Sequence, residues 1–414
     1  MKYCLIGEKL SHSYSAELHT AMGVDYSLVE VAQNALADFL HGTVYDGFNV
    51  TIPYKKAVMP YLDSLDESAT LCGAVNTVKR DGNKLVGYNT DLDGMCYMME
   101  SKGVTLTGKH VLILGSGGTS NTAQALAKLQ GAQSVKVVSR TGEINYTKCY
   151  DLADTEVIIN TTPVGMYPNV YEKPVELARF ARYGRLTAVF DCIYNPFCTA
   201  LLSEAKSLNL VCSDGLPMLV RQAVLAENIW QNKPDDPQLT PKLIALMRSN
   251  KANLILFGMP SSGKTTLGKM LAEKLGKPFV DLDEYVATKY GKSPAEIIKE
   301  SGEQFFRKLE SEAVRDVAPS SGKIISLGGG TVIDPDNVAN LKMNGVMIYL
   351  NRDLHLLSTD NRPLSLAHGV EKLFEQRKSI YQKVKDAEVS NNGDLITVAK
   401  EIEKAYETAC NKWC

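Results

Sequence analysis

Two apolar runs end in glycine-rich turns, at Val111-Leu112-Ile113-Leu114-Gly115-Ser116-Gly117-Gly118 and at Leu254-Ile255-Leu256-Phe257-Gly258-Met259-Pro260-Ser261-Ser262-Gly263-Lys264-Thr265. The first turn has the form that lays the pyrophosphate of a dinucleotide on the N-terminus of a helix. The second is a complete P-loop, in which backbone amides surround phosphates, the lysine reaches the outer ones and the threonine hydroxyl ligates Mg²⁺. The sequence therefore predicts a redox step and a phosphoryl transfer in one chain.

Length and composition indicate an ordinary globular protein of several domains. The chain has 414 residues, of which 44% are hydrophobic and 22% charged, and this suits two or three domains that each build a core. The formal net charge of −2 and the pI of about 6.3 give no basic surface for nucleic acid or anionic lipid. We therefore expect small-molecule substrates and neither a nucleic-acid nor a membrane partner, while the oligomeric state stays open.

The N-terminus and the cysteines favour a cytoplasmic protein. The first apolar run is too short for a signal peptide, and no run approaches the roughly 18 apolar residues of a membrane-spanning helix. The nine cysteines are odd in number and scattered, and Cys410 and Cys414 lack a second pair that would complete a zinc pattern. We expect reduced, structural thiols.

Strands alternate with helices along much of the chain, which predicts an α/β fold with parallel sheets. Beyond the first glycine turn we expect a helix over Thr122–Leu129, strands at 134–138, 156–160 and 187–191, and a helix over Gly215–Trp230. A polar stretch with two prolines follows and is typical of a linker. The predicted parts are an α/β substrate-binding and catalytic lobe (1–98, with helix 215–231 packed back on it), a Rossmann domain (99–232), a linker (233–251) and a P-loop domain (252–414).

Short patterns surround the first glycine turn. They are Ser11-His12-Ser13-Tyr14-Ser15, Gly47-Phe48-Asn49-Val50-Thr51-Ile52-Pro53-Tyr54-Lys55, Gly73-Ala74-Val75-Asn76-Thr77, Gly87-Tyr88-Asn89-Thr90-Asp91, Asn160-Thr161-Thr162-Pro163-Val164-Gly165-Met166, Tyr194-Asn195-Pro196 and Gly215-Leu216-Pro217-Met218-Leu219-Val220-Arg221-Gln222. Each is weak alone, but in this order they resemble the shikimate dehydrogenase family over residues 1–232. The resemblance implies a two-lobed enzyme that reduces 3-dehydroshikimate to shikimate with NADPH.

By this resemblance Lys55 and Asp91 are the catalytic pair. Hydride delivery to a ketone builds an alkoxide, which needs a proton from a positioned acid. A protonated lysine supplies the proton and stabilises the developing charge, while a nearby carboxylate orients its ammonium group. Ser13 and Ser15 match positions that hold the substrate carboxylate. The positions that match ring-hydroxyl contacts or lie close to the substrate are Thr51, Lys55, Asn76, Asp91, Tyr194 and Gln222.

The end of the second strand of the nucleotide domain predicts the cofactor. Enzymes that use NAD place an acidic residue there for the ribose hydroxyl, whereas an arginine accommodates the additional phosphate of NADP. Arg140 therefore predicts NADP, although Ile144 stands where the family often has a second basic residue. The resemblance adds further cofactor-binding positions: Gly115, Ser116, Gly117, Gly118, Thr162 and Gly215.

A second series of motifs follows the P-loop. It comprises Asp281-Leu282-Asp283, the stretch 302–310 with Phe306 and Arg307, Gly328-Gly329-Gly330, Arg362-Pro363-Leu364 and Arg377-Lys378-Ser379-Ile380-Tyr381. In this order the motifs resemble shikimate kinase over residues 252–400. The resemblance implies phosphoryl transfer from ATP to shikimate.

The kinase resemblance also implies roles for single residues. Asp283 would orient or deprotonate the attacking hydroxyl, and the guanidinium forks of Arg307 and Arg377 suit the substrate carboxylate. Thr265 and Asp281 would hold Mg²⁺. Close backbone approach to the substrate is implied for Gly328, Gly329 and Gly330. ATP-binding positions are Gly258, Ser261, Ser262, Gly263, Lys264, Thr265, Thr266 and, in the lid of the family, Arg362.

The leading prediction is a bifunctional enzyme of aromatic amino-acid biosynthesis, in which the dehydrogenase product is the kinase substrate. Two alternatives stay open: a metabolite sensor built from these domains, and a quinate-type dehydrogenase joined to another small-molecule kinase. Ser13 and Ser15 favour shikimate over quinate. Residues whose retention argues against a sensor are Lys55, Asp91, Lys264, Thr265, Asp283 and Arg307.

Overall fold

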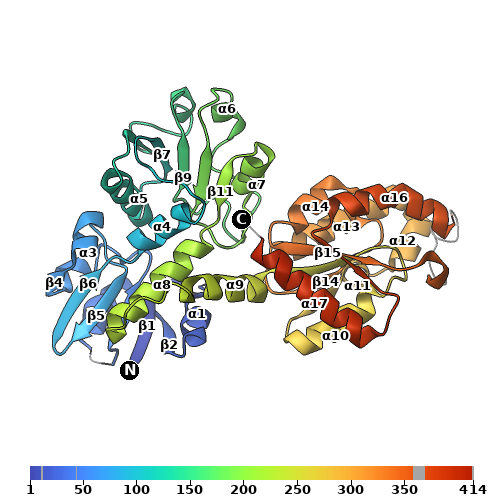
Figure 1. The fold of residues 1–414 in the computed structure, drawn as a ribbon, viewed down its shortest axis with the longest axis horizontal. Helices are drawn as coiled ribbons and strands as arrows, with labels where there is room; N and C mark the ends of the chain where they lie inside the picture. The colour runs from blue at the N-terminus through green and yellow to red at the C-terminus, as the bar shows by residue number, and fades with distance from the viewer. Residues whose placement is uncertain (11–12, 43, 358–368, 413–414) are drawn as a thin grey trace. The chain divides into compact units, whose positions relative to one another are not determined.

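The computed structural model describes residues 1–10, 13–42, 44–357 and 369–412. The chain divides into two compact units, residues 1–244 and 245–414. Figure 1 shows that the first unit contains two sheets and the second unit one. Each unit is therefore described by itself.

The first sheet has the strand order β2-β1-β3-β5-β6-β4. Its strands are β1 (Lys2–Gly7), β2 (Asp25–Glu30), β3 (Gly47–Val50), β4 (Ser64–Leu65), β5 (Thr77–Asp81) and β6 (Lys84–Tyr88). β1 pairs in parallel with β2 and β3, whereas β5 is antiparallel to β3 and β6. The helices of this lobe are α1 (Ser15–Ala21), α2 (Leu36–His41) and α3 (Glu67–Cys72).

The second sheet is parallel throughout and has the order β11-β10-β9-β7-β8. Its strands are β7 (His110–Leu114), β8 (Ser134–Val138), β9 (Val157–Asn160), β10 (Ala188–Asp191) and β11 (Val211–Ser213). The helices that belong to it are α5 (Gly118–Leu129), α6 (Ala178–Ala181) and α7 (Ala200–Ser207). Strands β7 and β9 are almost entirely buried, as expected where helices cover both faces of a parallel sheet.

Two helices, α4 (Asp91–Glu100) and α8 (Leu216–Gln231), pack against each other between these sheets (Figure 1). Gly94 permits the close approach, because a Cβ there would lie 2.7 Å from the carbonyl oxygen of Met218. At the far end of α8, the Trp230 ring stacks on Tyr3 with 4.5 Å between centroids, and its indole nitrogen donates to the Val78 carbonyl at 2.9 Å. Helix α8 therefore anchors onto the first sheet.

The sheet of the second unit is also parallel and has the order β13-β14-β12-β15-β16. Its strands are β12 (Asn253–Phe257), β13 (Phe279–Asp281), β14 (Ile324–Ser326), β15 (Gly345–Asn351) and β16 (Ala387–Ser390). Its helices are α10 (Lys264–Leu275), α11 (Leu282–Tyr290), α12 (Pro294–Ser301), α13 (Glu303–Val317), α14 (Pro335–Leu341), α16 (Val370–Val384) and α17 (Leu395–Asn411). The short 3₁₀ segment η4 spans Thr331–Ile333.

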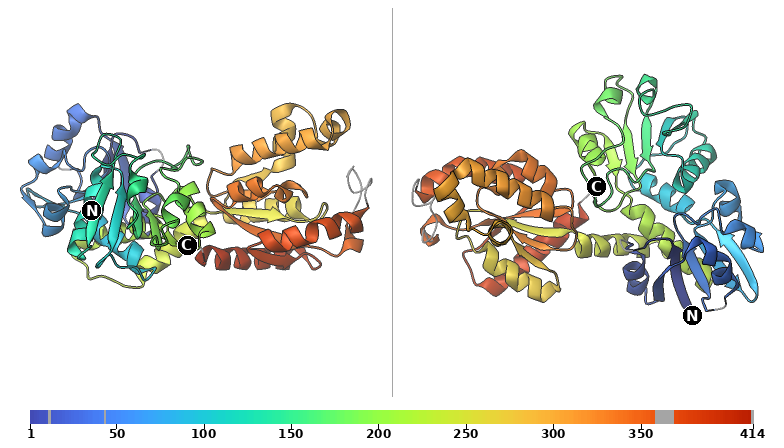
Figure 2. Two further views of the ribbon diagram at one scale, coloured as in Figure 1. Left: turned by 90° about the horizontal axis from the view of Figure 1, so that it is seen from above. Right: turned by 180° about the vertical axis from the view of Figure 1, so that it is seen from behind.

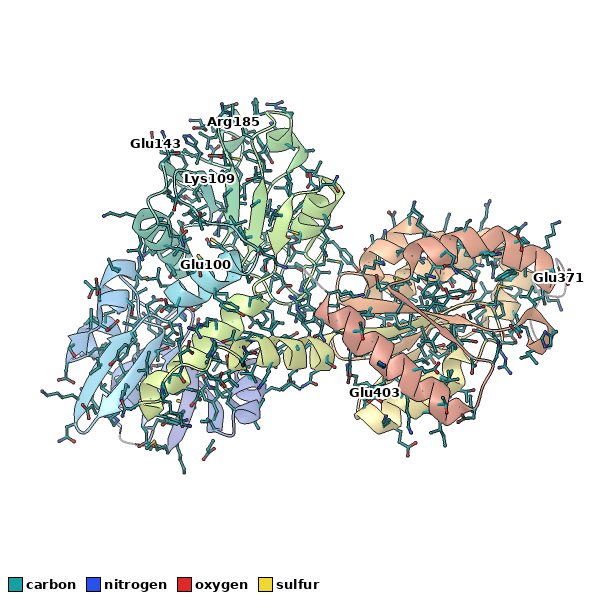
Figure 3. All side chains as sticks on the ribbon, in the orientation of Figure 1. Glu100, Lys109, Glu143, Arg185, Glu371 and Glu403 are labelled. Atoms are coloured by element: carbon teal, nitrogen blue, oxygen red, sulfur yellow. The ribbon has the colours of Figure 1, made fainter. Side chains whose placement is uncertain are left out.

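Helices cover both faces of this sheet (Figures 1 and 2). Helices α10 and α17 lie on one face, where Lys274 of α10 pairs with Glu403 of α17, a residue labelled in Figure 3. The main core lies on the other face and includes Ile255 and Phe257 of β12 together with Val314 of α13. The α/β class predicted from the sequence is confirmed.

The structure differs from the sequence-based boundaries by more than one residue in two places. Helix α5 begins at Gly118 rather than at Thr122, because amides of a first helical turn have no intrahelical partner and glycine is tolerated there. The expected linker is helical from Leu239 onward, as α9 (Leu239–Lys251). Pro241 stands in the first turn of α9, where its missing N–H costs no hydrogen bond.

The residues between α8 and α9 are held by polar contacts within the first unit. The Asp235 carboxylate accepts from the Arg221 guanidinium at 2.8 Å and from the Asn228 amide at 3.2 Å.

Within the described part of the chain, no helix combines the length and apolar character needed to cross a membrane.

A buried histidine joins α1 to α8. The Nδ1 atom of His19 lies 2.6 Å from a carboxylate oxygen of Glu227, and the imidazole stacks on Tyr26 with 3.9 Å between centroids. The Nε2 atom has no hydrogen-bond partner among the described residues. Burial lowers the pKa of His19 below its ordinary value of 6.5, although Glu227 acts in the opposite direction. The fold therefore stabilises the neutral imidazole.

We predict that acid destabilises the first unit through His19. Below pH 6.5 the histidine binds a proton in the unfolded chain but stays neutral in the folded one. The contribution of neutral His19 to the free energy of unfolding is therefore full above pH 6.5 and is lost as the pH falls. One such proton corresponds to at most about 1.4 kcal/mol per pH unit. Urea unfolding followed by tryptophan fluorescence between pH 7.5 and 5.5 should show a weaker pH dependence in His19→Gln than in wild type. The exposed His41→Gln serves as the control, and equal slopes in all three proteins would contradict the prediction.

Candidate active sites

Lys55 and Asp91 form an ion pair in the first unit. The ammonium nitrogen of Lys55 lies 2.6 Å from Asp91 Oδ2, and their side chains are only 16% and 9% exposed. Lys55 follows β3, and its carbonyl accepts from the amide of Val75 at 2.8 Å. Asp91 is the first residue of α4. A shielded ammonium that is fixed by a carboxylate can donate a proton to an adjacent group.

The pair lines a cavity of about 500 Å³. Each residue expected to contact the substrate of the first unit lines it: Ser13, Ser15, Thr51, Lys55, Asn76, Asp91, Tyr194 and Gln222. These side chains come from both lobes and from α8, so the fold brings together residues that are far apart in sequence. Burial raises the pKa of the Tyr194 phenol to about 12, which keeps this hydroxyl protonated and able to donate.

Several further residues that line the same cavity were not identified as site residues from the sequence. These include Lys9, Asn49, Thr119, Met166, Cys192, Met218 and Leu219. Asn49 is the most informative, because its amide donates to Thr77 Oγ1 at 3.0 Å and its Oδ1 accepts from the Tyr26 hydroxyl at 2.7 Å. Its place within the quoted motif 47–55 was the available signal. The partner Tyr26 could not be found from the sequence, because the contact is long-range.

Asn76 is held by a buried set of hydrogen bonds. Its Oδ1 accepts from the amide of Thr90 at 2.8 Å, and its Nδ2 donates to Thr90 Oγ1 at 3.0 Å. The Asn76 backbone carbonyl also accepts from the backbone amide of Val50 and from the side-chain amide of Asn49. The orientation of the Asn76 amide is therefore set before any ligand arrives.

The first glycine turn lies beside this cavity. Gly115 has φ +104°, and a Cβ at that position would lie 2.8 Å from Thr161 Oγ1. Gly117 precedes α5 without any side-chain cap and has open space on its Cβ side. A Cβ at Gly118 would lie 3.6 Å from Lys55 Cδ. The turn thus offers uncapped amides and room for a diphosphate, next to the Lys55 side chain.

Buried polar groups fix the loops that follow β9 and β10. Asp191 accepts from Asn160 at 3.0 Å and from the Thr199 hydroxyl at 2.7 Å. Asn160 in turn accepts from the amide and hydroxyl of Thr162, an expected cofactor contact. Burial raises the pKa of Asp191 to about 7. Gly215, another expected cofactor contact, has no room for a Cβ, which would lie 2.1 Å from the Cys192 carbonyl oxygen.

Arg140 follows β8, with its side chain exposed. Among the described residues no ion pair to Arg140 is found. Burial raises the pKa of the nearby Tyr146 phenol, and the positive charge of Arg140 acts in the opposite direction. An exposed guanidinium at the end of this strand can meet a phosphate group.

The P-loop of the second unit has the backbone that its sequence predicts. Gly258 and Gly263 have φ of +149° and +91°, and Ser261 is also left-handed at +65°. The Lys264 ammonium is buried and donates to the carbonyls of Gly258 and Met259 at 3.3 and 2.8 Å. The hydroxyl oxygen of Ser262 is buried without a partner among the described residues. These groups fit the phosphates of a nucleotide.

Thr265 and Asp281 meet at the bottom of the P-loop. The Thr265 hydroxyl donates to Asp281 Oδ2 at 2.6 Å. The other Asp281 oxygen caps α11 by accepting from the amides of Asp283 and Glu284. Hydroxyl and carboxylate oxygens are ligands that Mg²⁺ prefers, so the pair fits that ion. Among the described residues, no group of three or more His, Cys, Asp or Glu side chains could hold a metal by itself.

The expected acceptor-binding residues converge on the turn Gly328–Gly330, which follows β14. A Cβ at Gly328 would lie 3.1 Å from Asp283 Oδ1, and one at Gly329 would lie 3.1 Å from Arg377 Nη1. At Gly330 a Cβ would lie 2.3 Å from Arg307 Nη2. The three glycines therefore leave the room that these side chains occupy.

Arg307 is paired with two carboxylates. Its guanidinium donates to Glu310 at 2.7 Å and to Glu303 at 2.9 Å. Glu310 is 1% exposed and also accepts from the Thr331 hydroxyl at 2.6 Å, whereas Glu303 is 43% exposed. Neither glutamate was identified as a site residue from the sequence. The expected lid residue Arg362 lies outside the described residues.

Comparison with known proteins identifies related families for both units. A family model described as shikimate dehydrogenase substrate binding domain matches residues 5–78. A second family model, described as shikimate kinase, matches residues 260–407. The two matches lie in different units.

Relatives and solved structures resemble the first part of the chain. The shikimate dehydrogenase (NADP(+)) of Clostridium beijerinckii is 34% identical over 267 residues, which cover 60% of this chain and 98% of the relative. The fusion of chorismate mutase and shikimate 5-dehydrogenase from Clostridium acetobutylicum superposes with a TM-score of 0.56 at 34% identity, covering 59% of this chain and 96% of that one. The shikimate 5-dehydrogenase of Thermus thermophilus, solved with NADP(H) and shikimate, gives a TM-score of 0.53 at 27% identity, covering 59% and 98%.

We predict that Asp281→Asn weakens metal-dependent nucleotide binding. The amide can still cap α11, but it removes the charge beside Thr265, so the dissociation constant of Mg·ATP should rise about tenfold. Titration with a fluorescent ATP analogue measures this constant. When EDTA removes Mg²⁺, the dissociation constants of the variant and of wild type should differ by less than about twofold. Asp334→Asn, which alters a cap on α14, is the matched control. An equal loss with and without Mg²⁺ would contradict a metal role for Asp281.

Proposed function

This chain belongs to the shikimate dehydrogenase family and also carries a shikimate kinase domain, and we propose that it catalyses two consecutive steps. The first is the NADPH-dependent reduction of 3-dehydroshikimate to shikimate. The second is the ATP-dependent phosphorylation of shikimate to shikimate 3-phosphate. The enzyme then serves aromatic amino-acid biosynthesis, and the free thiols of its eight described cysteines agree with a cytoplasmic location.

The Lys55–Asp91 ion pair carries the dehydrogenase proposal. It lies in one cavity with every expected substrate contact and beside the dinucleotide turn. NADPH supplies the hydride. Lys55 donates its proton to the oxygen that develops negative charge, and Asp91 keeps the ammonium aimed at that oxygen. Water is excluded because both side chains are largely buried.

The polar side chains of the cavity suit a small hydroxylated acid. Ser13 and Ser15 hold the carboxylate of the substrate, and the amide of Ser15 already donates to Ser13 Oγ at 3.2 Å. The preset amide of Asn76 binds a ring hydroxyl. Thr51 and Gln222, which line the same cavity, bind the remaining hydroxyl groups.

In the second unit Asp283 orients the attacking hydroxyl, while Arg307 and Arg377 hold the carboxylate of shikimate. Lys264 stabilises charge on the transferred phosphoryl group, and Mg²⁺ held through Thr265 and Asp281 would share that task. Such a reaction depends mainly on positioning and electrostatics. The convergence of the acceptor residues on the glycine turn 328–330 supports this assignment.

The alternatives receive no support from the comparisons. The matched families are dehydrogenases and kinases of shikimate, and the residues that a non-catalytic sensor tends to lose are retained. The order of the units also follows the order of the reactions, since the product of the first is the substrate of the second.

The proposal predicts a sequential product pattern. Wild-type protein mixed with 3-dehydroshikimate, NADPH, ATP and Mg²⁺ should form shikimate 3-phosphate, which mass spectrometry detects. Lys55→Met should slow the reduction by about 10²–10⁴-fold and still phosphorylate added shikimate. Lys264→Met should accumulate shikimate. The retained activity of the unchanged unit normalises the protein concentration in each variant, and circular dichroism checks that the substituted unit is folded. A wild type that converts neither substrate would refute the proposal.

A second prediction concerns the choice of cofactor. Removing the guanidinium in Arg140→Ala should raise the KM for NADPH about tenfold or more, because charge-assisted hydrogen bonds to the ribose phosphate are lost. The KM for NADH should change less than about twofold, since NADH lacks that phosphate. Lys136→Ala changes an exposed residue of β8, the strand that Arg140 follows, and is the control. Equal changes for both cofactors would show that Arg140 does not discriminate between them.

A further inference from the structure

Tyr381 connects the glycine turn of the kinase unit to the P-loop. This residue of α16 is completely buried, and its hydroxyl donates to the carbonyl oxygen of Gly329 at 2.5 Å. The same hydroxyl lies 3.9 Å from the sulfur of Met259, the second residue of the P-loop. One phenol group therefore contacts both loops that the proposed reaction must align.

The position of the Tyr381 ring is set by the sheet. Its centroid lies 5.7 Å from that of Phe257 on β12 and 5.3 Å from that of Tyr349 on β15. β12 is the strand that leads directly into the P-loop, and β15 is its neighbour. Burial raises the pKa of the Tyr381 phenol, so the hydroxyl stays protonated and remains a donor.

Gly329 lies close to both the P-loop and Arg377. Pro260 of the P-loop would lie 2.9 Å from a Cβ at Gly329, and Arg377 would lie 3.1 Å from it. Arg377 stands one helical turn before Tyr381 on α16, and its positive charge acts to lower the pKa of the Tyr381 phenol against the larger effect of burial. The hydroxyl thus fixes the glycine turn between the phosphate-binding loop and an expected carboxylate-binding arginine.

We propose that Tyr381 is a positioning residue of the phosphoryl-transfer site. Three consecutive glycines have much backbone freedom, and a hydrogen bond from a rigid, buried phenol holds their turn in one conformation. Because this turn lies beside Asp283, Arg307 and Arg377, its position sets where the acceptor hydroxyl stands relative to the outer phosphate. A displacement of about 1 Å in such a site can cost about 10²-fold in rate. This inference rests on the kinase activity proposed above.

Tyr381→Phe tests the proposal because it removes only the hydroxyl. The kinase kcat/KM for shikimate should fall about tenfold, the effect of one lost hydrogen bond to a buried group. The KM for ATP should stay within about twofold of wild type, since the P-loop keeps its own backbone hydrogen bonds. The dehydrogenase activity of the same chain should not change, and it measures the concentration of protein whose first unit is folded, while the melting temperature of the second unit reports its own folding.

Tyr349→Phe is the matched control. Its ring belongs to the same aromatic cluster, but its hydroxyl contacts Asn351 at 3.4 Å, and among the described residues no hydrogen bond from it to either loop is found. Both variants are assayed well below their melting temperatures. A kcat/KM for shikimate that falls in Tyr381→Phe and not in Tyr349→Phe supports the positioning role.

Other outcomes overturn the inference in distinguishable ways. Retention of kcat/KM by Tyr381→Phe in an active background refutes the positioning role and leaves the kinase function intact. Equal losses in both variants, in step with their melting temperatures, reduce Tyr381 to a core residue. A wild type that does not phosphorylate shikimate refutes the kinase function itself.

Discussion

Both candidate sites depend on one constraint of parallel sheets. A buried strand must leave the sheet at its carboxyl end, and the turn that follows has to present backbone amides without burying them unsatisfied. Strand β7 meets this constraint through Gly115–Gly118, and β12 meets it through the P-loop. A helix begins directly after each turn, so uncapped amides face outward at the point where a phosphate can accept from them. The chemistry of each unit is arranged around that point.

The two turns serve different ligands because their surroundings differ. The first is open on the Cβ side of Gly117 and lies beside Lys55, the expected proton donor. The second closes on itself around Lys264. In the sheet order β13-β14-β12-β15-β16, Asp283 and the glycine turn 328–330 follow β13 and β14, on one side of the P-loop.

Much of this was predictable from the sequence, because the informative signals were local. Strand β8 has the predicted bounds. The expected substrate contacts of the first unit line one cavity, and each of them belongs to a short motif that can be recognised from neighbouring residues alone. Long-range partners gave no such signal. The contact of Tyr26 with Asn49 and that of Tyr381 with Gly329 join segments that no local pattern relates. Helix α9 was predicted as part of a linker because it contains Pro241, although the first turn of a helix tolerates proline.

Lys55 and Arg307 are already paired with carboxylates before any substrate binds, and this determines what binding can contribute. Lys55 is paired with Asp91, and Arg307 with Glu303 and Glu310. A substrate carboxylate that reaches Arg307 competes with the exposed Glu303, while the buried Glu310 keeps its place and keeps the guanidinium oriented. The net gain is therefore the difference between two ion pairs rather than the whole of one. If Arg307 holds the substrate carboxylate as proposed, we expect moderate affinity for the acid and a preset geometry that favours turnover over tight binding of the substrate.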